Sequence, residues 1–220
     1  MCGLFDGGSD GVMVCGNYTK WRDLNCSERN VEIDVWVMAE DFAVAFTPEV
    51  NFTLVVEKHC TFSKLVQDNV HEKLSCVLIT GSGFAGECAR ALVYKMHRIL
   101  GLPVCGLIDG GPHGMLIYAN YKHGSCNLGA EFAVRDMLFM GLRWVDTVRL
   151  QLPTQPLTIK DKETTENYLK LLEFDPTCKE ELERTSQCGK KADLQALELH
   201  QARCIGSTYI PDRLKEMQLY

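Results

Sequence analysis

Three segments decide the fold: FTLVVEK at residues 52–58, CVLITGSGFAG at 76–86 and VCGLIDGGPHG at 104–114. Each opens with a short, mostly apolar run that is rich in branched residues. Such runs are typical of strands that are buried on both faces, as in parallel sheets. The sequence therefore predicts three core strands in this stretch.

Helical patterns separate these strands. Apolar residues recur at helical spacing from about residue 60 to residue 72, and again from about 86 to 100. Gly101 and Pro103 end the second helix, and Pro112 suits the first turn of another, where a missing N–H costs nothing. The pattern predicts an α/β fold with a mainly parallel sheet and helices on both faces.

The chain divides by pattern into three parts. Residues 1–49 form an N-terminal extension with a strand-like segment at 31–37, and residues 50–150 form the core. Residues 151–220 look mainly helical, so we expect a helical C-terminal part of the same domain.

The composition favours a folded chain outside the membrane. Of its 220 residues, 46% are hydrophobic, which allows a sizeable buried core. No apolar run approaches the roughly 18 residues of a spanning helix, and the N-terminus lacks the pattern of a signal peptide. The 11 cysteines are odd in number and include no C-x-x-C pair, which favours reduced thiols. We therefore expect a soluble intracellular protein.

The net charge of −6 excludes a basic protein that coats nucleic acid nonspecifically. A DNA-binding protein of this charge needs a local basic patch. Basic residues gather modestly at Arg90, Lys95, Arg98 and Lys122. This group is either such a patch or the solvated face of a helix.

Two acidic residues stand directly after predicted strands. Glu57 follows the first strand and Asp109 follows the third. Because parallel strands end at the same edge of a sheet, these carboxylates can converge there. Carboxylate oxygens suit Mg²⁺, which can stabilise charge in phosphodiester chemistry. The alternative is that both acids are solvated caps or salt-bridge partners.

A competing motif follows the second strand. Gly81, Gly83 and Gly86 have the spacing of the dinucleotide fingerprint, whose glycines let a pyrophosphate approach a helix N-terminus. Asp109 stands close to where a ribose-binding acid would be expected. Taken alone, this motif favours a Rossmann-type dinucleotide-binding protein.

The wider sequence contains several further motifs in a fixed order. They are Val55-Val-Glu57-Lys58, Thr80-Gly81-x-Gly83, Asp109-Gly-Gly-Pro112-His113-Gly114 and Tyr121-Lys122-His123-Gly124-Ser125, followed by Arg143-Trp144, Lys191-Ala-Asp-Leu-Gln-Ala-Leu197 and Tyr209-Ile-Pro-Asp-Arg-Leu214.

This series resembles the Toprim domain of the family that contains the A-type chain of topoisomerase VI and the meiotic double-strand-break protein (Spo-eleven), over roughly residues 50–214. The resemblance implies that Glu57 and Asp109 bind Mg²⁺. It makes His113 and Lys122 candidates for DNA or support contacts, and Arg90 joins them from the basic group. A histidine after proline at a helix start is also a common structural cap.

In the resembled family, a tyrosine on a separate winged-helix domain attacks the DNA backbone, and a dimer breaks both strands. ATP use belongs to a different chain of the complex. The resemblance therefore implies four things: DNA as a partner, a homodimer or a tyrosine-bearing partner chain, a further ATPase partner of the B type, and a nuclear location.

The sequence departs from the family pattern at two places. Gly111 stands where the D-x-D motif has its second aspartate, so one carboxylate is missing. The roughly 50 residues before Glu57 leave no room for a winged helix, and Tyr18, their only tyrosine, lacks the family's nucleophile context. We therefore expect a truncated, divergent or split member that does not cleave DNA alone and has no catalytic residue of its own.

Three hypotheses remain open from the sequence. The first is a DNA-binding Toprim portion of a double-strand-break or type IIB topoisomerase-like protein, acting with a tyrosine from elsewhere. The second is a noncatalytic interaction module of the same fold. The third is the dinucleotide-binding protein that uses Gly81, Gly83 and Gly86.

Overall fold

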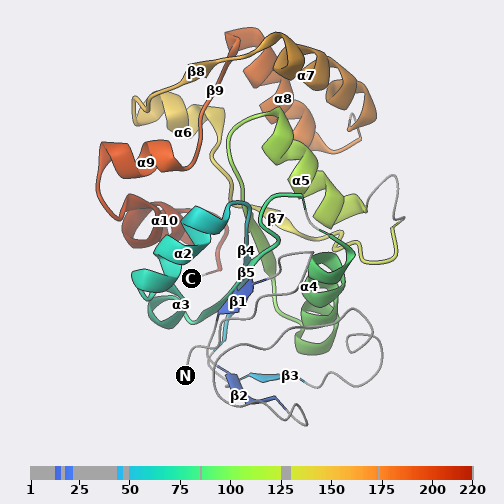
Figure 1. The fold of residues 1–220 in the computed structure, drawn as a ribbon, viewed down its shortest axis with the longest axis vertical. Coiled ribbons are helices and arrows are strands. Elements are labelled where there is room, and N and C mark those ends of the chain that lie inside the picture. The colour runs from blue at the N-terminus through green and yellow to red at the C-terminus, as the bar shows by residue number, and fades with distance from the viewer. Residues whose placement is uncertain are drawn as a thin grey trace. The chain divides into compact units, whose positions relative to one another are not determined.

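The computed structural model describes residues 13–15, 18–21, 44–46, 50–84, 86–124, 130–172 and 174–219 (Figure 1). The strand predicted at residues 31–37 lies outside them. The chain forms two compact units that interleave along the sequence. Unit 1 comprises Met1–Gly106 and Tyr121–Leu138, and unit 2 comprises Leu107–Asn120 and Phe139–Tyr220. Neither unit begins or ends at residue 150, where the sequence suggested the end of the core.

The main sheet has the strand order β1-β5-β4-β6-β7. Its two central predicted strands, β4 (Phe52–Val56) and β5 (Cys76–Thr80), are buried along their whole length and pair in parallel. The third predicted strand is β6 (Val104–Leu107). The edge strands are β1 (Met13–Cys15), which runs antiparallel to β5, and β7 (Leu138–Phe139).

Helices cover the sheet of unit 1 on both sides, as predicted. Figure 1 shows α2 (His59–Gln67) and α3 (Val70–Lys73) on one side of β4 and β5, and α4 (Glu87–Leu100) on the other. The single helix expected at 60–72 is two helices, because Asn69 adopts a left-handed conformation (φ 53°) that asparagine tolerates. Helix α4 ends at Gly101 (φ 63°), as predicted.

A small antiparallel pair lies between β1 and β4 in the chain. It joins β2 (Tyr18–Trp21) to β3 (Val44–Phe46).

Unit 2 is mainly helical, which confirms the prediction for the C-terminal region. Its long helices α7 (Ile159–Leu171) and α8 (Pro176–Cys188) pack against each other. Each begins with a side-chain cap, from Thr158 and Asp175 respectively. The other elements are α5 (Pro112–His123), most of which lies in unit 2, α6 (Trp144–Arg149), β8 (Gln155–Pro156), β9 (Lys190–Lys191), α9 (Gln195–His200), the π-helix η2 (Ile205–Tyr209) and α10 (Ile210–Glu216).

No helix in the described part of the chain is long and apolar enough to cross a membrane.

Candidate functional site

Asp109 is fixed at the end of β6 by a segment far along the chain. Its Oδ1 accepts a hydrogen bond of 2.8 Å from the backbone N–H of Leu194, 85 positions away. The neighbouring Gly110 pairs with Ala192 through two backbone hydrogen bonds of 2.9 Å. Asp109 is buried. The motif that begins at Lys191 therefore fixes the position of the Asp109 motif through backbone contacts.

The glycines of this motif permit close backbone contacts. A Cβ atom on Gly110 would lie 2.8 Å from the Leu142 carbonyl oxygen. A Cβ atom on Gly114 would collide with the carbonyl oxygen of Asp109. Side chains at these two positions are therefore incompatible with the way the loop packs.

Lys191 lies alongside Gly111, the position of the missing aspartate. A Cβ atom on Gly111 would lie 3.3 Å from Lys191 Cβ and 3.7 Å from Lys191 Cδ. The ammonium group of Lys191 pairs with Asp161 Oδ2 at 2.9 Å. Burial opposes ionisation of Asp161, but hydrogen bonds from Lys191 and Thr158 outweigh it and lower the pKa of Asp161 to about 2. Asp161 is therefore ionised at neutral pH.

His113, a predicted contact residue, lies near the ion pair of Lys191 and Asp161. Its side chain is 49% exposed, and its Nε2 lies 4.0 Å from Asp161 Oδ1. This geometry places His113 beside Asp161 while leaving half of its side chain accessible. Lys122, near the end of α5, is half-buried and belongs to unit 1.

Glu57 belongs to unit 1 and follows β4 directly. It is buried, and its carbonyl oxygen accepts a hydrogen bond of 2.9 Å from the N–H of Gly83. This hydrogen bond therefore fixes the turn after β5 to Glu57, the residue that follows β4. Gly83 has a φ of 116°, which a residue with a side chain rarely adopts.

Arg90 requires a correction to the prediction that it contacts DNA. Its side chain in α4 is 0% exposed. Burial lowers the pKa of its guanidinium, while electrostatic interactions with Tyr121 and Glu87 act in the opposite direction. A phosphate would meet this group only if the side chain left its site, so Arg90 is not placed to contact DNA. The sequence pattern predicts where basic residues lie along the helix, but it does not tell which of them points into the core.

Comparison with known proteins identifies the fold. A family model for the Toprim domain shared by Spo11 and the A-type chain of topoisomerase 6 matches residues 52–214. The chain belongs to this family. The α/β fold is a Toprim fold, as the sequence motifs predicted.

Relatives of the Toprim chain include animal and plant proteins. It is 34% identical over 176 residues to the meiotic recombination protein SPO11 of Homo sapiens, covering 76% of this chain and 44% of that protein. It is 32% identical over 178 residues to SPO11 of Mus musculus, with 76% and 44% covered. It is 29% identical over 173 residues to the A-type chain of DNA topoisomerase 6 of Arabidopsis thaliana, with 75% and 40% covered. The chain thus spans less than half the length of these relatives.

The strand order of the Toprim sheet argues against the dinucleotide alternative. In a Rossmann fold, the strand before the glycine motif lies next to the strand that follows the helix. Here the glycine motif follows β5, helix α4 comes next, and β6 follows. Strand β4 separates β5 from β6 in the sheet. The spacing of Gly81, Gly83 and Gly86 therefore occurs without the topology that gives the fingerprint its function.

The carboxylates of the Toprim motif suit a hard cation. Mg²⁺ is typically held by one or two carboxylates together with waters and substrate phosphates. Glu57 in unit 1 and Asp109 in unit 2 each carry such a group, and the Leu194 hydrogen bond orients that of Asp109. Within the described residues, no group of three or more His, Cys, Asp or Glu side chains could hold a metal alone. Each of these carboxylates is of the kind that Mg²⁺ takes.

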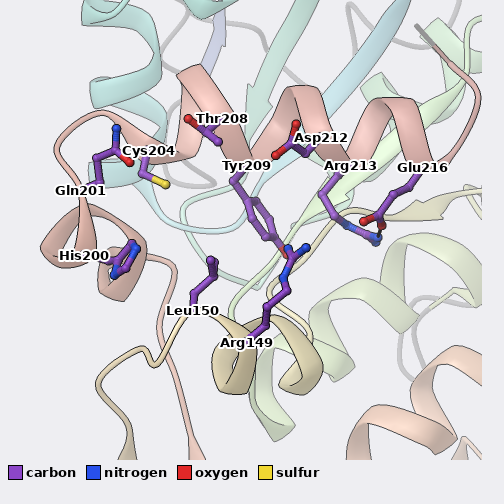
Figure 2. A pocket seen from close by; sticks show the side chains of 10 residues that line it. All are labelled: Arg149, Leu150, His200, Gln201, Cys204, Thr208, Tyr209, Asp212, Arg213 and Glu216. Atoms are coloured by element: carbon purple, nitrogen blue, oxygen red, sulfur yellow. Dashed lines mark hydrogen bonds and ion pairs between the residues drawn. The ribbon is translucent and has the colours of Figure 1, made fainter.

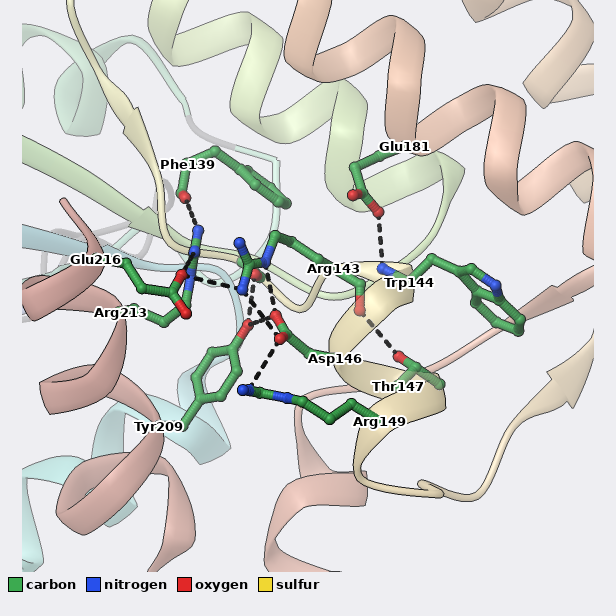
Figure 3. Close-up of polar contacts among 11 residues, drawn as sticks. Phe139, Arg143, Trp144, Asp146, Thr147, Arg149, Glu181, Tyr209, Arg213 and Glu216 are labelled. Atoms are coloured by element: carbon green, nitrogen blue, oxygen red, sulfur yellow. Dashed lines mark hydrogen bonds and ion pairs between the residues drawn. The ribbon is translucent and has the colours of Figure 1, made fainter.

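Two other Toprim motifs meet in a polar network in unit 2 (Figure 3). Asp146 is buried and accepts hydrogen bonds from Arg143 at 2.7 and 3.0 Å and from Arg149 at 3.0 Å. The Tyr209 hydroxyl reaches the same carboxylate. Arg213 donates to the Phe139 carbonyl oxygen at 2.7 Å. The network joins α6 to η2 and α10, so these motifs hold the C-terminal segment in place.

A pocket of about 90 Å³ opens beside this network (Figure 2). Arg149, Tyr209 and Arg213 are among the residues that line it. Both guanidinium groups already pair with acids, Arg149 with Asp146 and Arg213 with Glu216 at 2.6 Å. These pairs tie both arginines to the polar network.

Proposed function

We propose that this chain is the DNA- and Mg²⁺-binding Toprim part of a DNA double-strand-break or topoisomerase protein. The observation that carries the proposal is the fixed carboxylate of Asp109, oriented by Leu194 at the end of β6. The names of the relatives, a meiotic recombination protein and a chain of a DNA topoisomerase, favour DNA as the substrate. The attacking tyrosine would come from outside the described residues.

The proposed roles follow from the positions of the residues. Glu57 and Asp109 follow β4 and β6, which are neighbours in the sheet, and each would give Mg²⁺ one carboxylate. When bound, Mg²⁺ supplies positive charge that stabilises the attacking and leaving oxygens in phosphodiester chemistry. His113 would contact DNA or support Asp161, and Lys122 would contact a DNA phosphate.

The metal role is tested by calorimetric titration of Mg²⁺ in the presence of a short DNA duplex. Asp109→Asn removes the charge but keeps an oxygen that can accept the Leu194 hydrogen bond, so the loop should stay folded. We expect Asp109→Asn and Glu57→Gln each to raise the Kd for Mg²⁺ by about tenfold or more. Glu72→Gln is the matched control, because Glu72 is exposed on α3. Wild-type affinity in Asp109→Asn would contradict the metal role.

The same titrations separate the alternative functions. A noncatalytic interaction module predicts that the wild-type chain binds neither DNA nor Mg²⁺. A dinucleotide-binding protein predicts an enhancement of NADH fluorescence that Gly83→Val abolishes. Our proposal predicts DNA-dependent Mg²⁺ binding and no response to NADH.

The DNA role of Lys122 is tested by the salt dependence of binding to a labelled duplex. Each phosphate contact contributes about 0.9 to the slope of log K against log salt concentration. Lys122→Met should lower the slope by about that amount, whereas Lys162→Met, at an exposed position of α7, should leave it unchanged. Equal slopes for wild type and Lys122→Met would remove Lys122 from the interface.

The partners and location complete the proposal. We propose that the chain works as a homodimer or with a tyrosine-bearing chain, together with an ATPase partner of the B type, in the nucleus. Mass photometry should detect a dimer or a complex with those purified partners. A fluorescent fusion in meiotic cells should concentrate on chromosomes. A strictly monomeric chain that binds neither partner would refute the assembly.

A further inference from the structure

A lysine stands beside the one position where the metal motif lacks its acid. A Cβ atom built on Gly111 would lie 3.3 Å from the Cβ and 3.7 Å from the Cδ of Lys191, so the two positions are in van der Waals contact. The backbone bridge between Gly110 and Ala192 sets this register. The side chain of Lys191 therefore lies against the position where the second aspartate of the motif would stand.

The ammonium group of Lys191 is held in one place. Asp161 pairs with it at 2.9 Å, and Asp161 is itself held by the N–H of Thr158 at 3.0 Å and by the Thr158 hydroxyl at 2.8 Å. An ammonium has three N–H donors, so pairing with one carboxylate oxygen does not exhaust it. The Lys191 side chain is 26% exposed, which makes it accessible to a ligand.

Gly111 leaves one negative charge fewer at this place than the family motif implies. An aspartate at position 111 would bring a second carboxylate next to Lys191 and compete with Asp161 for its ammonium group. With Gly111 there, Asp161 is the acid that pairs with the lysine within the described part of the chain. A lysine binds phosphate as a point charge, so it can deliver to DNA the positive charge that a further metal ion would otherwise bring.

We propose that Lys191 binds a DNA phosphate beside Asp109, at the position where the Toprim motif has its second aspartate. The inference rests on the proposed function, because that function supplies the DNA. It adds a contact that does not need Mg²⁺. The competing explanation is that Lys191 only anchors Asp161 at the start of α7.

DNA binding without metal distinguishes the two explanations. The full 220-residue chain is titrated into a fluorescein-labelled duplex in EDTA at several KCl concentrations, with anisotropy as the readout. Lys191→Met should lower the salt slope by about 0.9, the contribution of one phosphate contact to B-DNA. Lys190→Met is the matched control, because Lys190 is the adjacent, exposed lysine of β9. Lys191→Arg should keep the slope.

A second pair of variants tests the same point without replacing Lys191. Gly111→Asp places a negative charge beside Lys191, and Gly111→Asn places a neutral group of nearly the same size there. We expect Gly111→Asp to lower the salt slope in EDTA, and Gly111→Asn to keep it. This comparison stays decisive even if Lys191→Met lowers stability.

The outcomes separate the two proposals. If the wild-type chain does not bind DNA, both the proposed function and this inference fail. If the wild type binds but Lys191→Met and Gly111→Asp keep its slope, the inference alone is overturned and Lys191 is an anchor. An equal loss in Lys190→Met and Lys191→Met would also overturn it, because the contact would then be a general effect of surface charge.

Discussion

Replacing Tyr209 with Phe removes one hydroxyl group from the network that holds the C-terminal segment. The hydroxyl oxygen lies 2.8 Å from the Gly141 carbonyl oxygen and 3.2 Å from Asp146 Oδ2 (Figure 3). A hydroxyl has one hydrogen to donate, so the two acceptors compete for it and the nearer carbonyl is favoured. Burial, together with the charge of Asp146, raises the pKa of Tyr209, so the hydroxyl stays protonated at neutral pH.

The expected cost follows from what the change leaves behind. A hydrogen bond contributes about 0.5–1.5 kcal/mol net, and a buried acceptor without its donor costs about 1–3 kcal/mol. Gly141 is buried and loses the donor to its carbonyl oxygen. Asp146 keeps Arg143 and Arg149, which limits its loss. We therefore expect Tyr209→Phe to lower the free energy of unfolding by about 2 kcal/mol.

Urea unfolding followed by circular dichroism measures this loss as a lower midpoint at an unchanged m value. Tyr94→Phe is the matched control, because the Tyr94 ring packs against Phe132 at 6.0 Å and no hydrogen bond of its hydroxyl occurs within the described residues. The control should stay within about 0.5 kcal/mol of wild type. If Tyr209→Phe changes stability no more than Tyr94→Phe, the network does not hold the segment.

Three further changes test the arrangement of single residues. Gly114→Ala should destabilise the chain by about 3 kcal/mol in the same urea assay, because a Cβ atom there collides with backbone; a neutral result would mean that the loop relaxes easily. Arg90→Met should leave the salt slope of DNA binding unchanged because Arg90 is buried, and a lower slope would restore it as a contact. Asp161 has a pKa lowered to about 2, so its stabilising effect is complete above about pH 4 and is lost as the pH falls toward 2. Asp161→Asn should therefore flatten the acid-side fall in urea midpoint, and an unchanged fall would contradict the ion pair with Lys191.

Local sequence signals were sufficient for the core elements. The buried runs formed β4, β5 and β6, and helix α4 ended at Gly101 because glycine alone takes its left-handed conformation cheaply. Pro112 opened α5 as expected. These outcomes depend on residues that are close together in the chain, which is why the pattern could predict them.

Contacts between distant segments could not be read from the pattern. The Leu194 hydrogen bond to Asp109 joins residues 85 positions apart, and Lys191 meets Gly111 next to the backbone bridge between Gly110 and Ala192. The burial of Arg90 was also hidden, since a periodic pattern does not tell which basic residue of a helix turns inward. The motif from Lys191 to Leu197 was the one available signal for the first of these contacts, because it stood out in the sequence without an assigned role.

The central proposal is that Glu57 and Asp109 each give a carboxylate to Mg²⁺. Iron-directed cleavage tests it most directly: Fe²⁺ replaces Mg²⁺ on the DNA-bound chain, ascorbate and hydrogen peroxide generate hydroxyl radicals at the metal, and mass spectrometry locates the backbone cuts. The proposal predicts cuts near both residue 57 and residue 109, which excess Mg²⁺ suppresses and Asp109→Asn abolishes. Cuts near only one of these residues, or cuts that persist in Asp109→Asn, would contradict it.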